Sequence, residues 1–180
     1  MRKLSHEEIT SQRPTLKELS DKERFPIISV LDNIRSMYNV GSVFRTSDAC
    51  RIERLVLCGM TAQPPRKEIE KTALGSVDSV PWNYYQNSVE AVSDLKNQGI
   101  QVVSVEHCSH SVDYRKLEVE YPVALVFGHE VTGVKDEIIE LSDHAIEIPM
   151  YGVKQSLNIA VAYGIITYHF VNEYLRSKEA

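Results

Sequence analysis

Short apolar runs alternate with segments of helical periodicity along most of this chain. The first apolar run contains Ile27, Ile28, Val30 and Leu31. Val40, Val43 and Phe44 follow at the spacing of one helix face, and a second apolar run contains Leu55, Val56 and Leu57. This order predicts a strand, a helix and a strand.

The alternation continues through the second half of the chain. A helix is predicted after Ser88, which can cap it, and it ends before Gly99. The remaining predicted elements are strands over 100–105, 123–127 and 145–148, a short helix through Val134, Ile138 and Leu141, and a long helix from about Ser156 to Arg176. Strands that alternate with helices and are apolar throughout indicate a mostly parallel sheet covered by helices on both faces. The predicted fold class is α/β.

The last predicted helix is apolar nearly all round. Its apolar positions are Ile159, Val161, Ala162, Ile165, Ile166, Phe170, Val171 and Tyr174. One sheet face covers only one side of such a helix, so either further burial within the monomer or a subunit interface must cover the rest. We favour the interface.

Two short segments precede the first predicted strand. Ser5 with Glu8, and Thr15 with Glu18, have the spacing of a capping box, which predicts short helices. We therefore expect residues 1–24 to form an N-terminal arm. No linker divides residues 25–180, which predicts a single domain.

The composition narrows the class of protein. The chain has 180 residues, 43% of them hydrophobic, but no uninterrupted apolar stretch long enough to cross a bilayer. Polar residues 5–8 stand where a signal peptide would need an apolar run, so we expect a cytoplasmic protein. The three cysteines have no Cys-x-x-Cys spacing and predict reduced thiols rather than a disulfide framework.

Charge is distributed unevenly along the chain. The formal net charge of −5 argues against indiscriminate binding to phosphate backbones. Residues 1–75 carry 13 Lys and Arg against 10 Asp and Glu, a net of +3, whereas residues 76–180 carry 7 against 15, a net of −8. A polyanion is therefore expected to meet the N-terminal half.

Three polar clusters follow apolar strands, at the positions where open parallel sheets hold their ligands. They are Asn33, Arg35, Asn39, Gly41 and Arg45; Gly128, His129, Glu130 and Gly133; and residues 148–152 with Ser156, Leu157 and Asn158. Taken singly, each cluster also fits an ordinary polar loop, with Asn39 or Ser156 as a helix cap. In the second cluster, a glycine lets a ligand approach the backbone closely.

In this order the three clusters resemble the three motifs of the SpoU (TrmH-like) methyltransferases of the SPOUT superfamily. Residues 33–45 are similar to the first motif, residues 125–133 to the second and residues 148–158 to the third. The likeness spans about residues 25–175. Ser36 and Met37 depart from it, because the family usually has an acid and a proline there.

The resemblance implies a fold, a cofactor and a reaction. The fold is α/β with a C-terminal trefoil knot, in a homodimer. The reaction is methyl transfer from S-adenosylmethionine to a ribose 2′-hydroxyl of RNA. The short N-terminal arm, which has no recognisable RNA-binding domain, favours a compact tRNA over a large rRNA site. The residues that it implies are Asn39, Arg45, Glu130, Ser156 and Asn158 for catalysis, Gly128, Ile148 and Leu157 for the cofactor, and Arg35, Arg66, Lys67 and Lys71 for RNA phosphates.

The resemblance gives Arg45 the role of a base, but elementary chemistry favours another role. A guanidinium keeps its proton at neutral pH. A positively charged Arg45 that stabilises the forming alkoxide and binds the adjacent phosphate needs no loss of that proton. We therefore predict that Arg45 acts electrostatically.

Other functions compete with this one. A catalytically silent RNA-binding or assembly protein would not need all five catalytic candidates, and a base-directed RNA methyltransferase is a second alternative. The absence of a Gly-x-Gly-x-x-Gly after the first strand and of a phosphate-loop motif argues against dinucleotide and ATP enzymes. His107, Cys108 and His110 have no second ligand group at zinc spacing, so no metal site is predicted.

Overall fold

A seven-stranded sheet forms the centre of the computed structural model, which describes residues 1–20 and 22–179. The strand order is β3-β2-β1-β6-β4-β7-β5, and neighbouring strands are parallel. The strands are β1 (Phe25–Asp32), β2 (Ile52–Cys58), β3 (Trp82–Tyr85), β4 (Gln101–Val105), β5 (Val112–Asp113), β6 (Val123–Phe127) and β7 (His144–Glu147). The predicted α/β class is confirmed.

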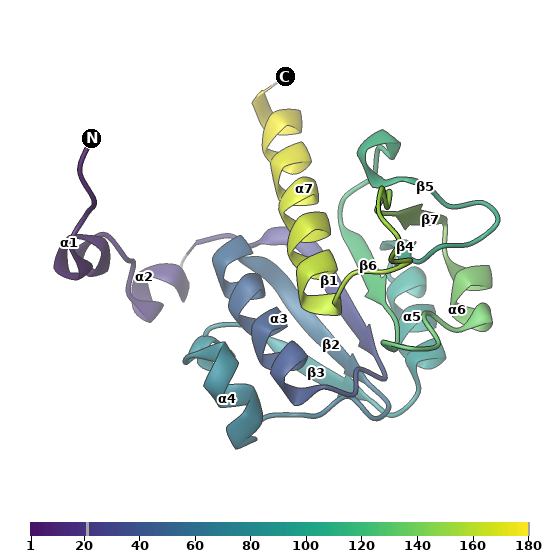
Figure 1. Ribbon diagram of the computed structural model, residues 1–180, viewed down its shortest axis with the longest axis horizontal. Helices are drawn as coiled ribbons and strands as arrows, with labels where there is room; N and C mark the ends of the chain where they lie inside the picture. The colour runs from purple at the N-terminus through teal and green to yellow at the C-terminus, as the bar shows by residue number, and fades with distance from the viewer. Residues whose placement is uncertain (21, 180) are drawn as a thin grey trace.

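Helices cover both faces of this sheet. Helices α3, α4 and α7 pack on one face, and α5 and α6 pack on the other (Figure 1). The helices are α1 (His6–Ser11), α2 (Leu16–Ser20), α3 (Met37–Cys50), α4 (Lys67–Ala73), α5 (Ser88–Asn97), α6 (Asp136–Leu141) and α7 (Ile159–Glu179), with single 3-10 turns η1 (Ser76–Asp78) and η2 (Tyr114–Lys116).

Strand β1 shows why the central strands are apolar at every position. Ile27 and Leu31 belong to the core beneath α3 and α7, whereas Ile28 and Val30 belong to the core beneath α5 and α6. Successive side chains of a strand point to opposite faces of its sheet. A strand with helices on both sides must therefore be apolar on both faces.

The structure corrects several predicted boundaries. Helix α7 begins at Ile159 rather than near Ser156, and its cap is Asn158, whose Oδ1 accepts a hydrogen bond of 2.9 Å from the Ala160 N–H. Asn87 rather than Ser88 caps α5. The last main strand, β7, covers 144–147 instead of 145–148. In both helices the residue whose side chain accepts the capping hydrogen bond sets the start.

The predictions miss the short elements at the sheet edge and surface. Strand β3 has only four residues, and none of them is fully buried. Helix α4 has seven residues, of which only Ile69 and Ala73 are buried. Such segments lack the length over which a period in hydrophobicity can be recognised.

The N-terminal segment lies apart from the sheet and its covering helices (Figure 1). Both predicted capping boxes form: Ser5 and Glu8 exchange side-chain-to-backbone hydrogen bonds, as do Thr15 and Glu18. No residue of α1 is buried. Helix α1 is thus held mainly by its own cap, whereas the Leu19 carbonyl of α2 also accepts a hydrogen bond of 3.0 Å from the Arg51 side chain.

Helix α7 uses one face to pack on α3 and the sheet. Its buried residues are Ile159, Tyr163, Ile166, Thr167, Phe170 and Val171. The opposite face exposes Val161, Tyr168 and Leu175. No helix within residues 1–20 and 22–179 is both long and apolar enough to cross a membrane.

Candidate active site

A cavity of about 1010 Å³ opens at the carboxyl ends of β4, β6 and β7. Its walls come from the segments that follow these three strands and from the first turn of α7. Six of the predicted site residues line it: Gly128, Glu130, Ile148, Ser156, Leu157 and Asn158. The second and third sequence motifs therefore share one cavity.

The first motif joins the other two through a chain of side-chain hydrogen bonds. Asn158 Nδ2 donates to Asn39 Oδ1 at 3.2 Å, and Asn39 Nδ2 donates to Glu130 Oε1 at 3.2 Å. The backbone N–H groups of Arg35 and Ser36 donate to the same carboxylate at 2.9 and 3.1 Å. Asn39 and Asn158, which are 119 residues apart in sequence, thus meet beside Glu130. This meeting of the three motifs defines the candidate active site.

These hydrogen bonds fix the charge state of Glu130. Partial burial alone would raise its pKa, but the hydrogen bonds from the backbone of Arg35 and Ser36 and from the Asn39 amide outweigh burial and lower the pKa from 4.5. Glu130 is therefore a carboxylate at neutral pH that accepts hydrogen bonds. It orients its neighbours and has no proton to give.

The two asparagine amides are oriented by the same network. Asn158 Oδ1 accepts the Ala160 N–H, so its Nδ2 must face Asn39. Each amide nitrogen carries two N–H groups, and in both residues the described chain engages one of them. The second N–H of Asn39 and of Asn158 can hold an oxygen atom of a ligand.

The loop of the second motif closes tightly on itself. A Cβ on Gly128 would stand 2.2 Å from the backbone of Gly133 and Val134, so Gly128 is needed for contact within the loop. Gly128 also lines the cavity, and the expectation that it lets a ligand approach the backbone stays a prediction. Gly133 has φ +71°, and Glu106 holds the next N–H, that of Val134, at 2.8 Å.

Glu106 is a cavity residue that the sequence analysis does not single out. It follows β4 directly and lines the cavity together with Glu147, the last residue of β7. The hydrogen bond from the Ser111 hydroxyl lowers the pKa of Glu147, so this group is anionic at neutral pH. Ligand sites of parallel sheets lie at the carboxyl ends of the strands, where both residues are found. The same rule applied to the predicted strand 100–105 identifies Glu106 as a candidate.

The third motif provides an exposed loop. Residues 150–158 are largely exposed, with Tyr151 at 88% and Val153 at 99%. Ser156 and Leu157 line the cavity from this loop, and Ile148 lines it just beyond β7. Large apolar side chains around a cavity entrance mark a surface suited to contact with another molecule.

Among the predicted catalytic residues, Asn39 reaches the cavity wall through its hydrogen bonds to Glu130 and Asn158, whereas Arg45 does not line the cavity. Arg45 is exposed on α3, whose buried face carries Val40, Val43, Phe44 and Ser47. Asn39 lies on the α7 side of the helix, whereas Arg45 is six residues later, which at 100° per residue turns it by about 120° from Asn39. Arg45 therefore does not line the cavity of its own chain, and its catalytic role stays a prediction.

The predicted RNA-binding residues form a second, separate feature. Arg66, Lys67 and Lys71 line a shallow hollow of about 560 Å³ beside α4, and all three are exposed. Arg35 is also exposed, in the loop between β1 and α3. In the part of the chain that the structure describes, no three His, Cys, Asp or Glu side chains are placed to hold a metal ion.

Comparisons with known proteins agree with this arrangement of motifs. Residues 26–168 match the family described as the SpoU rRNA Methylase family. The chain is 36% identical over 154 residues to a tRNA (guanosine(18)-2′-O)-methyltransferase of Aquifex aeolicus, covering 85% of this chain and 72% of that protein. It is 29% identical to a putative TrmH family tRNA/rRNA methyltransferase of Staphylococcus aureus, of which it spans 61%.

Solved structures show the same similarity in three dimensions. The A. aeolicus TrmH/SpoU tRNA modifying enzyme superposes with a TM-score of 0.81 at 33% identity, covering 91% of this chain and 82% of the other. An AdoMet-bound rRNA methyltransferase from Sinorhizobium meliloti superposes with a TM-score of 0.77 at 31% identity, covering 83% of this chain and 56% of the other.

Proposed function

The chain belongs to the SpoU rRNA Methylase family, and on that basis we propose that it transfers a methyl group from S-adenosylmethionine to a ribose 2′-hydroxyl of RNA. The observation that carries the proposal is the convergence of Asn39, Glu130 and Asn158, from three separate motifs, beside one cavity. A protein that only bound RNA would not need a buttressed carboxylate and two oriented amides at this position.

The cavity suits S-adenosylmethionine in size and chemistry. Its volume of about 1010 Å³ is at the upper end of small-molecule sites, roughly 300 to 1,000 Å³. Phe127, Ile146 and Ile148 provide apolar surface for the adenine. The carboxylates of Glu106 and Glu147 offset the positive charge of a sulfonium and an ammonium group.

The cofactor supplies an electrophilic methyl group, and the residues of the chain hold the acceptor in line. We assign to the second N–H groups of Asn39 and Asn158 the task of holding the ribose oxygen. Glu130 keeps both amides in place, because it is an anion held by two backbone N–H groups. The Ser156 hydroxyl, at the cavity wall, is a further hydrogen-bonding group for the ribose.

The position of Arg45 supports a site completed by a second copy of the chain. The residue is exposed and lies outside the cavity of its own chain. Exposed apolar side chains surround the entrance, among them Val131, Tyr151 and Val153. In a homodimer that covers this surface, Arg45 of one subunit stabilises the negative charge that develops on the ribose oxygen in the other as the hydroxyl proton passes to solvent water.

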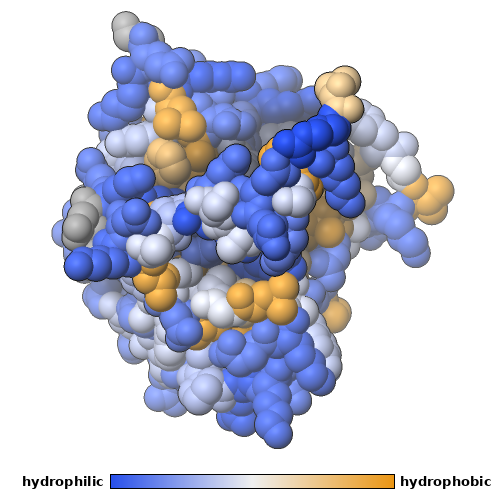
Figure 2. Space-filling view, turned by 90° about the vertical axis from the view of Figure 1, so that its left-hand side faces the viewer, coloured by the Kyte–Doolittle hydropathy of each residue, from blue (hydrophilic) through white to orange (hydrophobic). Residues whose placement is uncertain are grey.

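The face that carries α4 and the N-terminal helices suits an RNA backbone. Hydrophilic residues dominate this face, which is turned toward the viewer in Figure 2. Arg66, Lys67 and Lys71 lie on it, beside the hollow at α4. We assign phosphate contacts to these three residues and to Arg35, whose side chain is exposed next to the Glu130 network.

Transfer of tritium from labelled S-adenosylmethionine into bulk tRNA and rRNA tests the proposal. We expect label in RNA, and in tRNA rather than rRNA because the A. aeolicus relative is named for a tRNA nucleotide. Mapping the labelled nucleotide identifies the substrate. Binding of RNA with no label in either pool would favour the alternative of a catalytically silent binding protein.

A further inference from the structure

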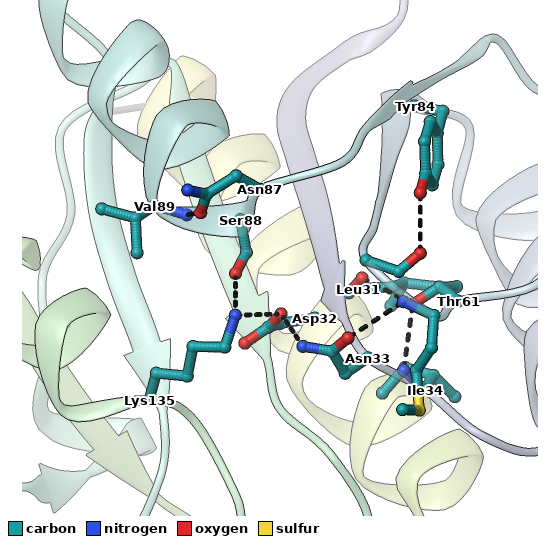
Figure 3. Close-up of polar contacts among 12 residues, drawn as sticks. Leu31, Asp32, Asn33, Ile34, Thr61, Tyr84, Asn87, Ser88, Val89 and Lys135 are labelled. Atoms are coloured by element: carbon teal, nitrogen blue, oxygen red, sulfur yellow. Dashed lines mark hydrogen bonds and ion pairs between the residues drawn. The ribbon is translucent and has the colours of Figure 1, made fainter.

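A buried aspartate pairs with a lysine at the carboxyl edge of the sheet, beside α5 and α6. Asp32, the last residue of β1, is 1% exposed, and Lys135 Nζ lies 3.4 Å from its Oδ1. The same ammonium group donates to the Ser88 hydroxyl at 2.8 Å. Figure 3 shows Lys135 reaching from the start of α6 to this carboxylate, past the first turn of α5.

The residue after Asp32 forms a rigid corner. Asn33 has φ +57°, a left-handed conformation that needs local support in a non-glycine residue. Its Nδ2 donates to Asp32 Oδ1 at 2.7 Å and its Oδ1 accepts the Met60 N–H at 2.9 Å, so both ends of the amide are engaged (Figure 3). A Cβ on Gly59 would stand 2.2 Å from Asn33 Oδ1, so only glycine fits there.

This corner leads directly into the candidate active site. The next N–H, that of Ile34, donates to Thr61 Oγ1, which in turn donates to the Leu31 carbonyl. The two N–H groups after it, on Arg35 and Ser36, hold the Glu130 carboxylate. The direction of these N–H groups therefore depends on how Asp32 and Asn33 are held.

We propose that Lys135 is a positioning residue for the Asn39–Glu130–Asn158 network. By pairing with Asp32 it fixes the Asn33 corner, and the corner aims two backbone N–H groups at Glu130. Lys135 also follows Glu130 by five residues, so it fastens the loops of the first and second motifs to each other. The proposed catalytic role of that network rests on the proposed function, but the positioning itself does not.

Amide hydrogen exchange at Arg35 and Ser36 measures the positioning directly. In Lys135→Met we expect these two amides to exchange about tenfold faster or more, because the corner opens locally more often. The matched control is Lys96→Met. Lys96 donates to Asp143 and the Leu141 carbonyl and so joins α5 to α6 at the opposite end of the same helices. Unchanged exchange of Arg35 and Ser36 in Lys135→Met, or equal acceleration in both variants, would overturn the proposal.

A second variant covers the case in which an unpaired buried Asp32 prevents folding. The double variant Asp32→Asn, Lys135→Met has no buried charge and keeps an oxygen that can accept from Asn33. Its Arg35 and Ser36 amides should also exchange about tenfold faster than in the wild-type chain, and wild-type exchange would overturn the proposal.

Lys135→Arg restores a cation and should return the exchange toward the wild-type rate; if it does not, the ion pair is not what holds the corner.

Methyl transfer gives an independent readout of the same residue. We expect Lys135→Met to lower kcat about tenfold or more while KM for S-adenosylmethionine changes less than about twofold. In a Glu130→Gln background Lys135→Met should have little further effect, because both changes act through one group; full additivity would overturn the proposal. A wild-type chain inactive on every RNA would remove the proposed function, whereas the exchange measurement would still decide the role of Lys135.

Discussion

At the scale of single residues, the site depends on which hydrogen-bonding groups face Glu130. Sequence patterns identify Asn39, Glu130 and Asn158 as candidates but cannot show that they form one chain of hydrogen bonds. The structure also assigns Gly128 to contact within its own loop. Lys135 is not predicted, because a single charged residue at the start of a short helix has no pattern that separates it from a solvated surface residue.

The charge of Glu130 predicts how stability depends on pH. Its pKa in the folded chain is lowered from 4.5, so its stabilising contribution is fully present above pH 4.5 and is lost as the pH falls through the lowered pKa. The difference in unfolding free energy between the wild-type chain and Glu130→Gln should therefore shrink on acidification below that range. Denaturant unfolding at a series of pH values measures it, and a difference independent of pH would contradict the hydrogen-bonded carboxylate.

Two glycines that line the same cavity form a matched pair. Gly128→Ala should cost about 1–3 kcal/mol of unfolding free energy, because its Cβ would meet backbone atoms at 2.2 Å. Gly152→Ala should change stability by less than about 0.5 kcal/mol, since among the described residues no atom beyond its two chain neighbours lies within 4 Å of the added Cβ. Urea unfolding of both variants tests this. Equal effects would mean that the second-motif loop is not as tightly closed as described.

At the scale of elements, α3 and α7 position the site by packing on β1. Tyr163 of α7 is fully buried, and its hydroxyl lies 2.6 Å from Ser47 Oγ and 3.2 Å from Ser29 Oγ. Burial raises its pKa to about 12, so it remains a neutral hydrogen-bonding group. The contact joins α7 to Ser47 of α3 and Ser29 of β1.

Removing the hydroxyl tests this contact. Tyr163→Phe should lower the unfolding free energy by about 1–2 kcal/mol, because it removes a buried partner of Ser29 and Ser47. Tyr38→Phe, at a half-exposed position, should change it by less than about 0.5 kcal/mol. Thermal unfolding of the two variants distinguishes them, and a Tyr163→Phe protein as stable as the Tyr38→Phe protein would show that the hydrogen bonds are dispensable.

The central strands are predictable from sequence because helices bury both of their faces, which makes them apolar at nearly every position. Strand β6 is fully apolar and is predicted with its correct bounds, 123–127. The start of α7 is not predictable in the same way, because Ser156 and Asn158 both have side chains that suit a helix cap. Only the folded loop shows that Asn158 is the cap. Strand order is likewise beyond a local pattern: β6 lies between β1 and β4 although it follows both in sequence.

At the scale of the whole molecule, the question is which chain supplies Arg45. The homodimer and the trefoil knot stay predictions, the first supported by the exposed apolar residues at the cavity entrance. A two-fold dimer has two equivalent sites, and each would combine Glu130 of one subunit with Arg45 of the other.

Mixing two inactive variants tests this sharing. Arg45→Ala and Glu130→Gln chains, unfolded together and refolded, should form mixed dimers in which one of the two sites is intact. Random pairing then restores about a quarter of wild-type methyl transfer. Each variant refolded alone is the control. No activity above these controls would mean that Arg45 and Glu130 act within one subunit or that Arg45 is not part of the site.

The most direct test of the central claim is the position of the transferred methyl group. RNA labelled from tritiated S-adenosylmethionine is digested with alkali, which cannot cleave after a 2′-O-methylated nucleotide. We predict that the label appears in alkali-resistant dinucleotides and falls about a hundredfold in Glu130→Gln, whose amide cannot hold the Asn39–Asn158 network as the carboxylate does. Label in alkali-released mononucleotides would contradict the account, because it would place the methyl group on a base.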